Sequence, residues 1–307
     1  MENKKAFITA DIHPFLQHQL ETKYIVDVDV AVSREKLLSV IEQYEILVIT
    51  TYLKVDKELI DKALNLKVVA RVGSGLENVD VDYAKSKGIY VINSPEGNAN
   101  AVGEHTLGIL LNLMNKINSS NLALKQQIWN RESFRGEELD GKTIGIIGYG
   151  HTGPAFAKKL TGFEVNILIN DIVLKEQVNQ VDIETIQKEC DIISLHIPYT
   201  PLTHHLINLE FISKCEKKPI VINTSRGSVI DTPAIIHALK HQKIKGFCVD
   251  VFEDEPIGAG KKYPPMLYHQ LLNFENVVAT SHVAGWTIES KYKLVEVLWQ
   301  KMQDFIA

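Results

Sequence analysis

Apolar residues recur along the chain in two series of short β-type runs separated by helical patterns. The first series consists of Phe7–Thr9, Tyr24–Val26, Ile46–Thr50, Lys67–Arg71 and Tyr90–Ile92. The second consists of Lys142–Ile147, Val165–Asn170, Asp191–His196, Ile220–Thr224, Gly246–Asp250 and Val277–Thr280. Strands that alternate with helices are typical of βαβ units, which form parallel sheets. The pattern therefore predicts an α/β protein with two parallel-sheet domains.

Residues with helix-end preferences mark the helices of the first series. Asp56 is a favourable N-cap residue, and Gly88 suits the C′ position that closes a helix over residues 81–87. The series ends at a predicted break, Asn93–Asn98. A long helix is then predicted from Ala101 to Ile117. It is too hydrophobic to face solvent, so we expect it to pack on a core or on a partner subunit.

Two further helices are predicted near the C-terminal end. Thr232 followed by Pro233 indicates a helix with a hydroxyl N-cap and proline at its first position. The stretch from Thr287 onward has the spacing of an amphipathic helix. Because no strand follows it, we expect this helix to return to the first domain.

Length and composition restrict the class of protein. A chain of 307 residues suits two domains. A net charge of -5 without a sustained basic run gives no footprint for nucleic acid or for an anionic membrane. No apolar run reaches membrane-spanning length, and the first residues lack a signal-peptide core. Cys190, Cys215 and Cys248 are widely spaced without a C-x-x-C pair, so we expect no metal site and a reducing, cytoplasmic location.

One glycine-rich turn carries a candidate cofactor site. The run Lys142–Ile147 leads directly into G-x-G-x-x-G and then into a helical pattern. In a dinucleotide fingerprint the first glycine makes the tight turn, the second admits a pyrophosphate and the third lets helix and strand pack closely. The residues concerned are Gly148, Tyr149, Gly150, His151, Thr152 and Gly153. The alternative is a turn that serves packing alone.

The next strand ends in Asp171, near the spacing at which a carboxylate accepts hydrogen bonds from an adenosine ribose. Ile172 and Val173 follow it, and neither could hold a 2′-phosphate as an arginine would. These residues favour NAD as the cofactor over NADP.

Three ionisable residues stand at or just beyond strand ends in the second series, where ligands of open α/β sheets collect. They are Arg226, Glu255 and His282. A histidine can take the hydroxyl proton as hydride leaves an alcohol carbon, and a carboxylate can orient the imidazole. An arginine offers a planar pair of donors for a carboxylate or a developing alkoxide. Taken singly, each residue is better explained by a non-catalytic role: Arg226 as a surface ion pair, Glu255 as a solvated loop acid and His282 as a structural histidine.

These motifs closely resemble the D-isomer-specific 2-hydroxyacid dehydrogenase family, in particular its short phosphoglycerate dehydrogenase-like members. The resemblance covers nearly the whole chain. Besides the glycine turn it rests on Arg71–Asp80, Val102–Leu107, His196–Pro198, Asn223–Asp231, Asp250–Pro256 and His282–Gly285. It implies that Arg226, Glu255 and His282 are the catalytic triad of an enzyme that interconverts a D-2-hydroxy acid and its 2-oxo acid with NAD.

The resemblance also implies further roles. The backbone amides of Ser74 and Gly75 would bind the substrate carboxylate, and Asp250 would bind the nicotinamide carboxamide. Other residues implied to line the cofactor are Thr106, Ile172, His196, Pro198, Thr224, Ser225 and Gly285. Thr106 and His196 remain equally well explained as helix-packing and core groups. A Rossmann NAD domain, residues 98–284, would be inserted into a flavodoxin-like substrate domain, residues 1–97 plus 285–307. A homodimer would form through the helix at 101–117.

Departures from the family pattern bear on the substrate. Thr50 stands where phosphoglycerate-specific relatives commonly have arginine, which weakens the case for D-3-phosphoglycerate. Lys54 and Arg71 remain as possible anion partners, although either can be an ordinary surface residue. The alternative function is a non-enzymatic NAD(H)-sensing partner protein of the co-repressor type.

Overall fold

The computed structural model describes residues 4–173, 178–253, 255 and 266–305. These residues divide into two compact units. Unit 1 contains residues 4–99 and 286–305, and unit 2 contains the described residues from 100 to 285. The boundary between them falls within helix α5 (Pro95–Met114).

Unit 1 is built around a parallel five-stranded sheet in the order β2-β1-β3-β4-β5. Its strands are β1 (Lys5–Ile8), β2 (Ile25–Val28), β3 (Ile46–Ile49), β4 (Val68–Arg71) and β5 (Tyr90–Asn93). The chain runs from β1 to β2 on one side and returns to β3 on the other. This is the flavodoxin-like order, in which loops after neighbouring strands diverge and leave room for a ligand.

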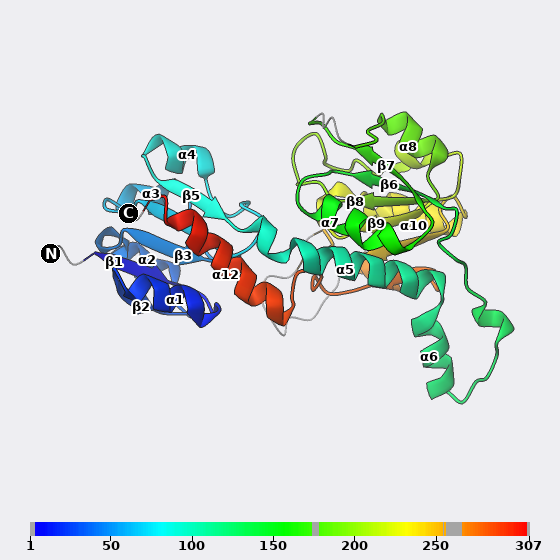
Figure 1. Ribbon diagram of the computed structural model, residues 1–307, viewed down its shortest axis with the longest axis horizontal. Helices are drawn as coiled ribbons and strands as arrows, with labels where there is room; N and C mark the ends of the chain where they lie inside the picture. The colour runs from blue at the N-terminus through cyan, green and yellow to red at the C-terminus, as the bar shows by residue number, and fades with distance from the viewer. Residues whose placement is uncertain (1–3, 174–177, 254, 256–265, 306–307) are drawn as a thin grey trace. The chain divides into compact units, whose positions relative to one another are not determined.

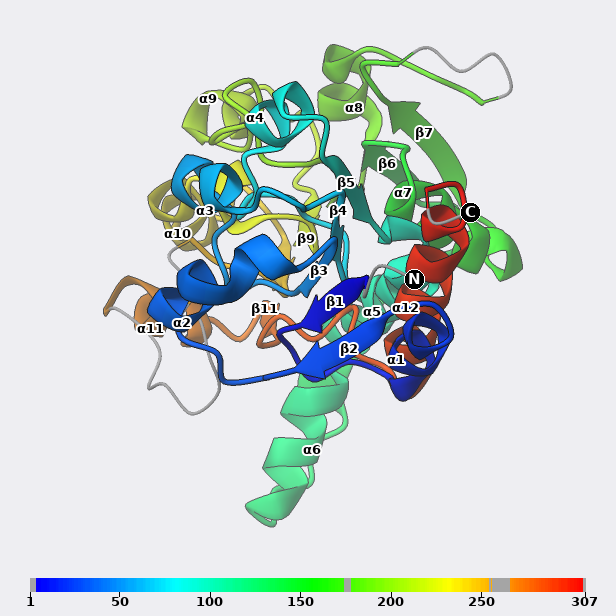
Figure 2. The ribbon, with the colours of Figure 1, turned by 90° about the vertical axis from the view of Figure 1, so that its left-hand side faces the viewer.

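Helices cover both faces of this sheet (Figures 1 and 2). On one face α1 (Pro14–Glu21) and α12 (Ile288–Met302) share a core with β1 and β3. On the other lie α2 (Arg34–Val40), α3 (Lys57–Lys62) and α4 (Val81–Ser86), with the short 3₁₀ turn η1 (Ile41–Gln43). Asp56 caps α3, and Gly88 follows α4 with a φ of +76°, as the sequence predicts. Helix α12 begins with a capping box at Thr287 and does return to the first sheet.

Unit 2 holds a parallel six-stranded sheet in the order β11-β10-β9-β8-β6-β7. Its strands are β6 (Thr143–Ile147), β7 (Asn166–Asn170), β8 (Ile192–Leu195), β9 (Ile220–Asn223), β10 (Gly246–Val249) and β11 (Val277–Ala279). The chain leaves β6 toward β7 and then crosses back to β8. The loop after β6 therefore stands at the topological switch point, where doubly wound sheets bind nucleotides.

Helices also cover both faces of the second sheet (Figure 1). Helices α5 and α7 (Thr152–Lys159) bury Ile109, Leu110 and Phe156 against one face. The opposite face carries α8 (Ile183–Glu189), α9 (Leu209–Ser213), α10 (Thr232–Lys240) and α11 (Met266–Leu272). The remaining elements are α6 (Ile117–Lys125), η2 (Glu132–Phe134), η3 (Leu160–Gly162) and η4 (Gly227–Val229). The two sheets confirm the predicted fold class.

The predicted start of the long helix at Ala101 is wrong, because α5 begins at Pro95. Proline is well suited to a first helical turn. Gly97 lies against α12, where a Cβ atom would come within 2.7 Å of the Leu294 backbone. The glycine therefore serves helix packing and not a turn. The same helix ends at Met114, and Lys116 adopts a left-handed φ of 50° before the separate helix α6.

The predicted N-cap of α10 is also wrong. Asp231 caps the helix by accepting from the Ala234 amide, and Thr232 is already helical. The Thr232 hydroxyl donates instead to Glu253 Oε2 at 2.7 Å.

Two further observations concern the burial of the cysteines and the character of the helices. Cys190 and Cys248 are buried, and burial raises the pKa of the Cys190 thiol to about 12. Among the described residues no helix combines the length and the apolar character needed to cross a membrane.

Candidate active site

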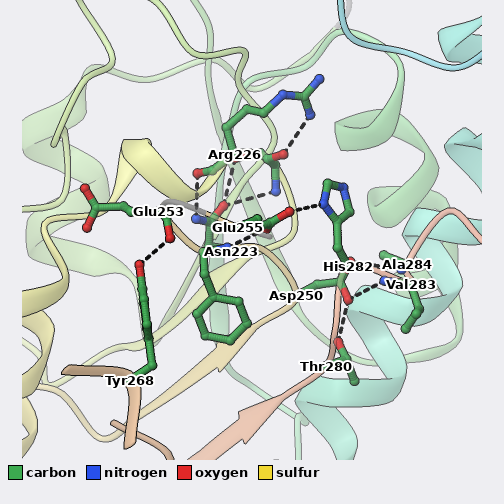
Figure 3. Close-up of polar contacts among 12 residues, drawn as sticks. Asn223, Arg226, Asp250, Glu253, Glu255, Tyr268, Thr280, His282, Val283 and Ala284 are labelled. Carbon is green, nitrogen blue, oxygen red and sulfur yellow. Dashed lines mark hydrogen bonds and ion pairs between the residues drawn. The ribbon is translucent and has the colours of Figure 1, made fainter. Parts of the chain in front are cut away.

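His282 and Glu255 form a hydrogen-bonded pair beyond the carboxyl ends of β11 and β10 (Figure 3). The Nδ1 atom of His282 lies 2.5 Å from Glu255 Oε2. An ionised carboxylate only accepts hydrogen bonds, so Nδ1 donates the proton. The other carboxylate oxygen, Oε1, accepts the Phe252 amide at 2.6 Å. This arrangement directs His282 Nε2 away from Glu255, and the histidine side chain is 52% exposed.

The surroundings of His282 favour its protonated form. The hydrogen bond that His282 donates to Glu255 raises the pKa of His282 above the usual value, while partial burial opposes this change. The charges of Glu255 and Asp250 raise the pKa further, and the charge of Arg226 lowers it. Glu255 and Arg226 therefore both lie close enough to His282 to act on its charge.

Asp250 holds the loop that carries His282. Its side chain is fully buried and accepts from the Thr280 hydroxyl at 2.6 Å and from the Val283 and Ala284 amides at 2.9 Å. Its backbone oxygen accepts the His282 amide at 2.8 Å. His282 has a φ of +56°, a left-handed conformation that side chains other than glycine seldom adopt. The Asp250 hydrogen bonds fix this loop in that conformation.

Arg226 follows β9 on a loop that is fixed by Asn223. The Asn223 amide donates to the Arg226 carbonyl at 2.9 Å, and Asn223 Oδ1 accepts from the amide and hydroxyl of Ser225. The guanidinium donates to the Ser225 carbonyl at 2.8 Å. Figure 3 shows Arg226 beside Glu255 and His282.

The loops after β9 and β10 are joined at Gly227 and Glu253. A Cβ atom at Gly227 would lie 2.0 Å from the Phe252 carbonyl, so only glycine allows this approach. Glu253 accepts from His205 Nε2 and from the Thr232 hydroxyl, each at 2.7 Å. The loop that carries Arg226 and the loop that carries Glu255 are thereby held in register.

The glycine turn after β6 has the shape of a phosphate cradle. Gly148 has a φ of +92°, and a Cβ atom there would lie 2.4 Å from the His196 carbonyl oxygen. A Cβ atom at Gly153 would lie 2.2 Å from the Gly148 oxygen, whereas one at Gly150 would meet nothing within 4 Å. The first and third glycines are thus required for packing. The open space at Gly150, in front of the N-terminus of α7, fits a pyrophosphate.

Asp171 lies at the end of β7 next to this turn. Its carboxylate accepts from the Tyr149 amide at 2.5 Å and from the Val173 amide at 2.8 Å. The neighbouring Ile172 is 96% exposed. A carboxylate fixed in this way can still accept hydrogen bonds from ribose hydroxyls, since each oxygen has two acceptor positions.

His196 is buried beneath the cradle, in contact with Ser194 Oγ at 2.9 Å and Thr152 Oγ1 at 3.2 Å. Burial lowers the pKa of His196 to about 3, so the ring is neutral near pH 7. Thr106, on α5, bonds to Thr224 Oγ1 at 3.1 Å in the same unit. Both residues are well explained by these internal contacts.

The remaining candidates for the cofactor site differ in exposure. His151 and Pro198 are exposed, Ser225 is buried and Gly285 is partly buried. His151 occupies the N-cap position of α7 without a capping side-chain bond, so it leaves the first-turn amides of that helix to another acceptor.

The substrate-binding candidates belong to unit 1 and follow β3 and β4. Ser74 Oγ donates to Asn98 at 2.8 Å, and the Ser74 carbonyl accepts the Asn93 side chain at 2.6 Å. Arg71 folds over this loop, because its Nη1 fills the space next to Gly73 where a Cβ would lie at 1.7 Å. Gly75 is buried, and Lys54 is exposed on the loop after β3.

Sequence reasoning did not identify His105, Thr280 or His205 as parts of the site. His105 lies within the motif Val102–Leu107, and Thr280 lies just before the motif His282–Gly285. Nothing in their spacing indicates that the two side chains are in contact. His105 Nε2 lies 2.9 Å from Thr280 Oγ1, a contact 175 positions apart in the chain.

Comparison with known proteins identifies the family. Residues 107–284 match the model described as the NAD binding domain of D-isomer specific 2-hydroxyacid dehydrogenases. The chain is 36% identical to a hydroxypyruvate reductase of Thermotoga maritima, with 88% of each chain covered. It is also 36% identical to a D-3-phosphoglycerate dehydrogenase of Methanocaldococcus jannaschii; there the match covers 94% of this chain but only 54% of the relative.

A solved structure agrees with these matches. A D-lactate dehydrogenase of Aquifex aeolicus, complexed with NAD and lactic acid, superposes with a TM-score of 0.84 at 29% identity. The alignment covers 99% of this chain and 95% of that structure. The predicted resemblance is confirmed, and the chain belongs to the family of D-isomer specific 2-hydroxyacid dehydrogenases.

Proposed function

We propose that this chain catalyses the NAD-dependent interconversion of a D-2-hydroxy acid and its 2-oxo acid. The observation that carries the proposal is the His282–Glu255 pair, with Arg226 on the adjoining loop. The relatives described above are named as enzymes, which favours catalysis over the NAD-sensing alternative.

His282 would carry the proton. Because Nδ1 is bound to Glu255, Nε2 accepts the substrate hydroxyl proton during oxidation and returns it to the oxo group during reduction. Glu255 stabilises the resulting imidazolium and fixes the orientation of the ring. Bound NAD would supply the hydride acceptor, and NADH the donor, at the substrate carbon.

Arg226 would hold the substrate. Its guanidinium can donate two hydrogen bonds to a carboxylate or to the reacting oxygen. The Ser74 and Gly75 amides of unit 1 would bind the substrate carboxylate. Residues 98–284 would bind NAD through the Gly148–Gly153 cradle and Asp171, with contributions from the other cofactor candidates named above. Residues 1–97 and 285–307 would form the substrate domain.

A substrate panel tests the function and names the acid. NADH oxidation would be followed with glyoxylate, hydroxypyruvate and pyruvate, and NAD reduction with lactate, glycerate and 3-phosphoglycerate. A phosphorylated substrate would require Lys54 or Arg71 as an additional cation. Absence of turnover with every acid, despite NADH binding, would contradict the proposed function.

Asp171→Ala should weaken the preference for NAD over NADP by about 10-fold or more. The carboxylate accepts from ribose hydroxyls and would repel a 2′-phosphate, and the substitution removes both effects. The ratio of kcat/KM for the two cofactors measures the change. Asp182→Ala is a matched control, because Asp182 serves only as the α8 cap among its described contacts. An unchanged ratio in Asp171→Ala would place cofactor discrimination elsewhere.

Glu255→Gln should move the pH dependence of oxo-acid reduction to lower pH. Reduction requires protonated His282, and Glu255 raises the pKa of that histidine. The raised pKa keeps the acid form present to higher pH, so its loss lets the rate fall earlier as pH increases. The high-pH limb of kcat/KM, measured with NADH, records the shift. A limb that remains in place would show that His282 is not the group that titrates.

We further propose a cytoplasmic homodimer that assembles through the region of residues 101–117. Exposed Leu122 and Leu124 on α6 support a contact surface in this part of the chain. Light scattering of the purified protein would give its mass in solution.

A further inference from the structure

A chain of hydrogen bonds leads from helix α5 to the loop that carries His282. His105 Nε2 lies 2.9 Å from Thr280 Oγ1, and Thr280 Oγ1 lies 2.6 Å from Asp250 Oδ1. His105 Nε2 is also 3.6 Å from the same carboxylate oxygen. All three residues belong to unit 2.

The direction of these bonds follows from the acceptor at the end of the chain. The ionised Asp250 carboxylate can only accept, so the Thr280 hydroxyl gives it its single proton. The Thr280 oxygen is then an acceptor toward His105, and Nε2 must carry hydrogen. His105 thus fixes the rotamer of Thr280 and aims its hydroxyl at Asp250.

Asp250 connects the oriented Thr280 hydroxyl to the loop that carries His282. Its carboxylate accepts the Val283 and Ala284 amides, both at 2.9 Å, directly after His282. Oδ1 accepts from Thr280 and Val283 together, and Oδ2 accepts from Ala284. Much of the acceptor capacity of this buried carboxylate is therefore used to hold the left-handed turn at His282. A residue that fixes Asp250 also fixes the position of His282 Nε2.

We propose that His105 is a positioning residue for the proton-transfer histidine, acting through Thr280 and Asp250. This inference rests on the proposed function, in which His282 exchanges a proton with the substrate. It assigns to α5 a second task besides packing on the sheet, since the helix also holds the loop after β11.

The effect of His105 is separable from direct electrostatics. Within the described part of the chain, the charged groups whose fields act on His282 are Glu255, Asp250 and Arg226. His105 faces Thr280 and Asp250, so it affects His282 by orienting that loop. Loss of this order should weaken the Glu255–His282 hydrogen bond, lower the pKa of His282 and reduce kcat more than it changes KM.

The test uses the full chain and five variants. His105→Leu and Thr280→Val each break the chain of hydrogen bonds. The double variant combines both substitutions in this same chain. His105→Gln retains an N–H donor near the position of Nε2. His237→Leu, on the exposed face of α10, controls for the loss of a histidine.

We expect His105→Leu to lower kcat by about 10-fold, with the high-pH limb of reduction moved to lower pH. His105→Gln should recover most of the activity. The double variant should be no worse than the poorer single variant, because residues in one network are not additive. Additive losses, or a loss in His105→Leu with an unchanged pH limb, would overturn the proposal.

A measurement without turnover separates this proposal from the proposed function. NMR titration of labelled His282, and hydrogen exchange of the Val283 and Ala284 amides, report the loop directly. His105→Leu should lower the His282 pKa and accelerate exchange of both amides, while His237→Leu changes neither. If no acid is turned over, the proposed function fails while these two readouts still decide the role of His105. Unchanged titration and exchange would show that His105 only packs.

Discussion

His282→Asn should lower turnover by about two to four orders of magnitude while NADH binding stays close to normal. Asparagine is the informative replacement for two reasons. It tolerates the left-handed conformation that His282 adopts at a φ of +56°, and its amide can donate to Glu255 in place of Nδ1. It cannot exchange a proton near neutral pH. The loss therefore reports the missing acid–base group and not a collapsed loop.

The measurement is kcat for the best acid of the panel, with the NADH dissociation constant from fluorescence and the melting temperature as checks. His237→Asn, on the exposed face of α10, serves as the control for a lost histidine. Turnover within a few-fold of the parent protein would remove His282 from the proton path, and His282 would then be a structural residue of this loop.

The features that the sequence predicted well are those in which a residue acts on its own neighbours. Asp56 caps the helix that it precedes, and Gly88 ends the helix that it follows, because both depend on local backbone geometry. Gly153 behaves similarly, since the close approach that it allows is to the carbonyl oxygen of Gly148, five positions earlier. The pairing of His282 with Glu255 was suggested by their positions at strand ends, and the family resemblance favoured it over separate structural roles.

The features that the sequence could not predict depend on contacts between distant segments. Gly97 resembles a loop glycine, but it lies against Leu294, nearly two hundred positions later in the chain. Thr232 resembles an N-cap residue, but Asp231 is the N-cap of α10 and the Thr232 hydroxyl donates to Glu253. No local pattern marks His105 as part of the site, because its partner Thr280 lies 175 positions away in the chain. Local propensity gives no information about such partners.

Among positions of the site without a functional side chain, Gly227 should be the one at which substitution lowers activity most. A Cβ atom there would lie 2.0 Å from both the carbonyl carbon and the oxygen of Phe252. These are backbone atoms, so a side chain cannot rotate away to relieve the clash. The loop with Arg226 and the loop with Glu255 must instead separate, and Glu255 carries the hydrogen bond to His282.

Gly227→Ala should therefore reduce kcat/KM by about 100-fold, since a displacement of about 1 Å in a catalytic group can cost that much. The stability cost should be limited to about 1–3 kcal/mol, as for other overpacked positions. Gly162→Ala is the matched control, because a Cβ atom at Gly162 meets nothing within 4 Å.

Steady-state kinetics and thermal melts of both variants, together with the pH dependence of reduction, decide the outcome. A shift of the high-pH limb toward lower pH is expected in Gly227→Ala, because Glu255 moves away from the histidine whose pKa it raises. Parent-like activity in a folded Gly227→Ala protein would mean that the two loops adjust independently and that their close contact does not align the triad.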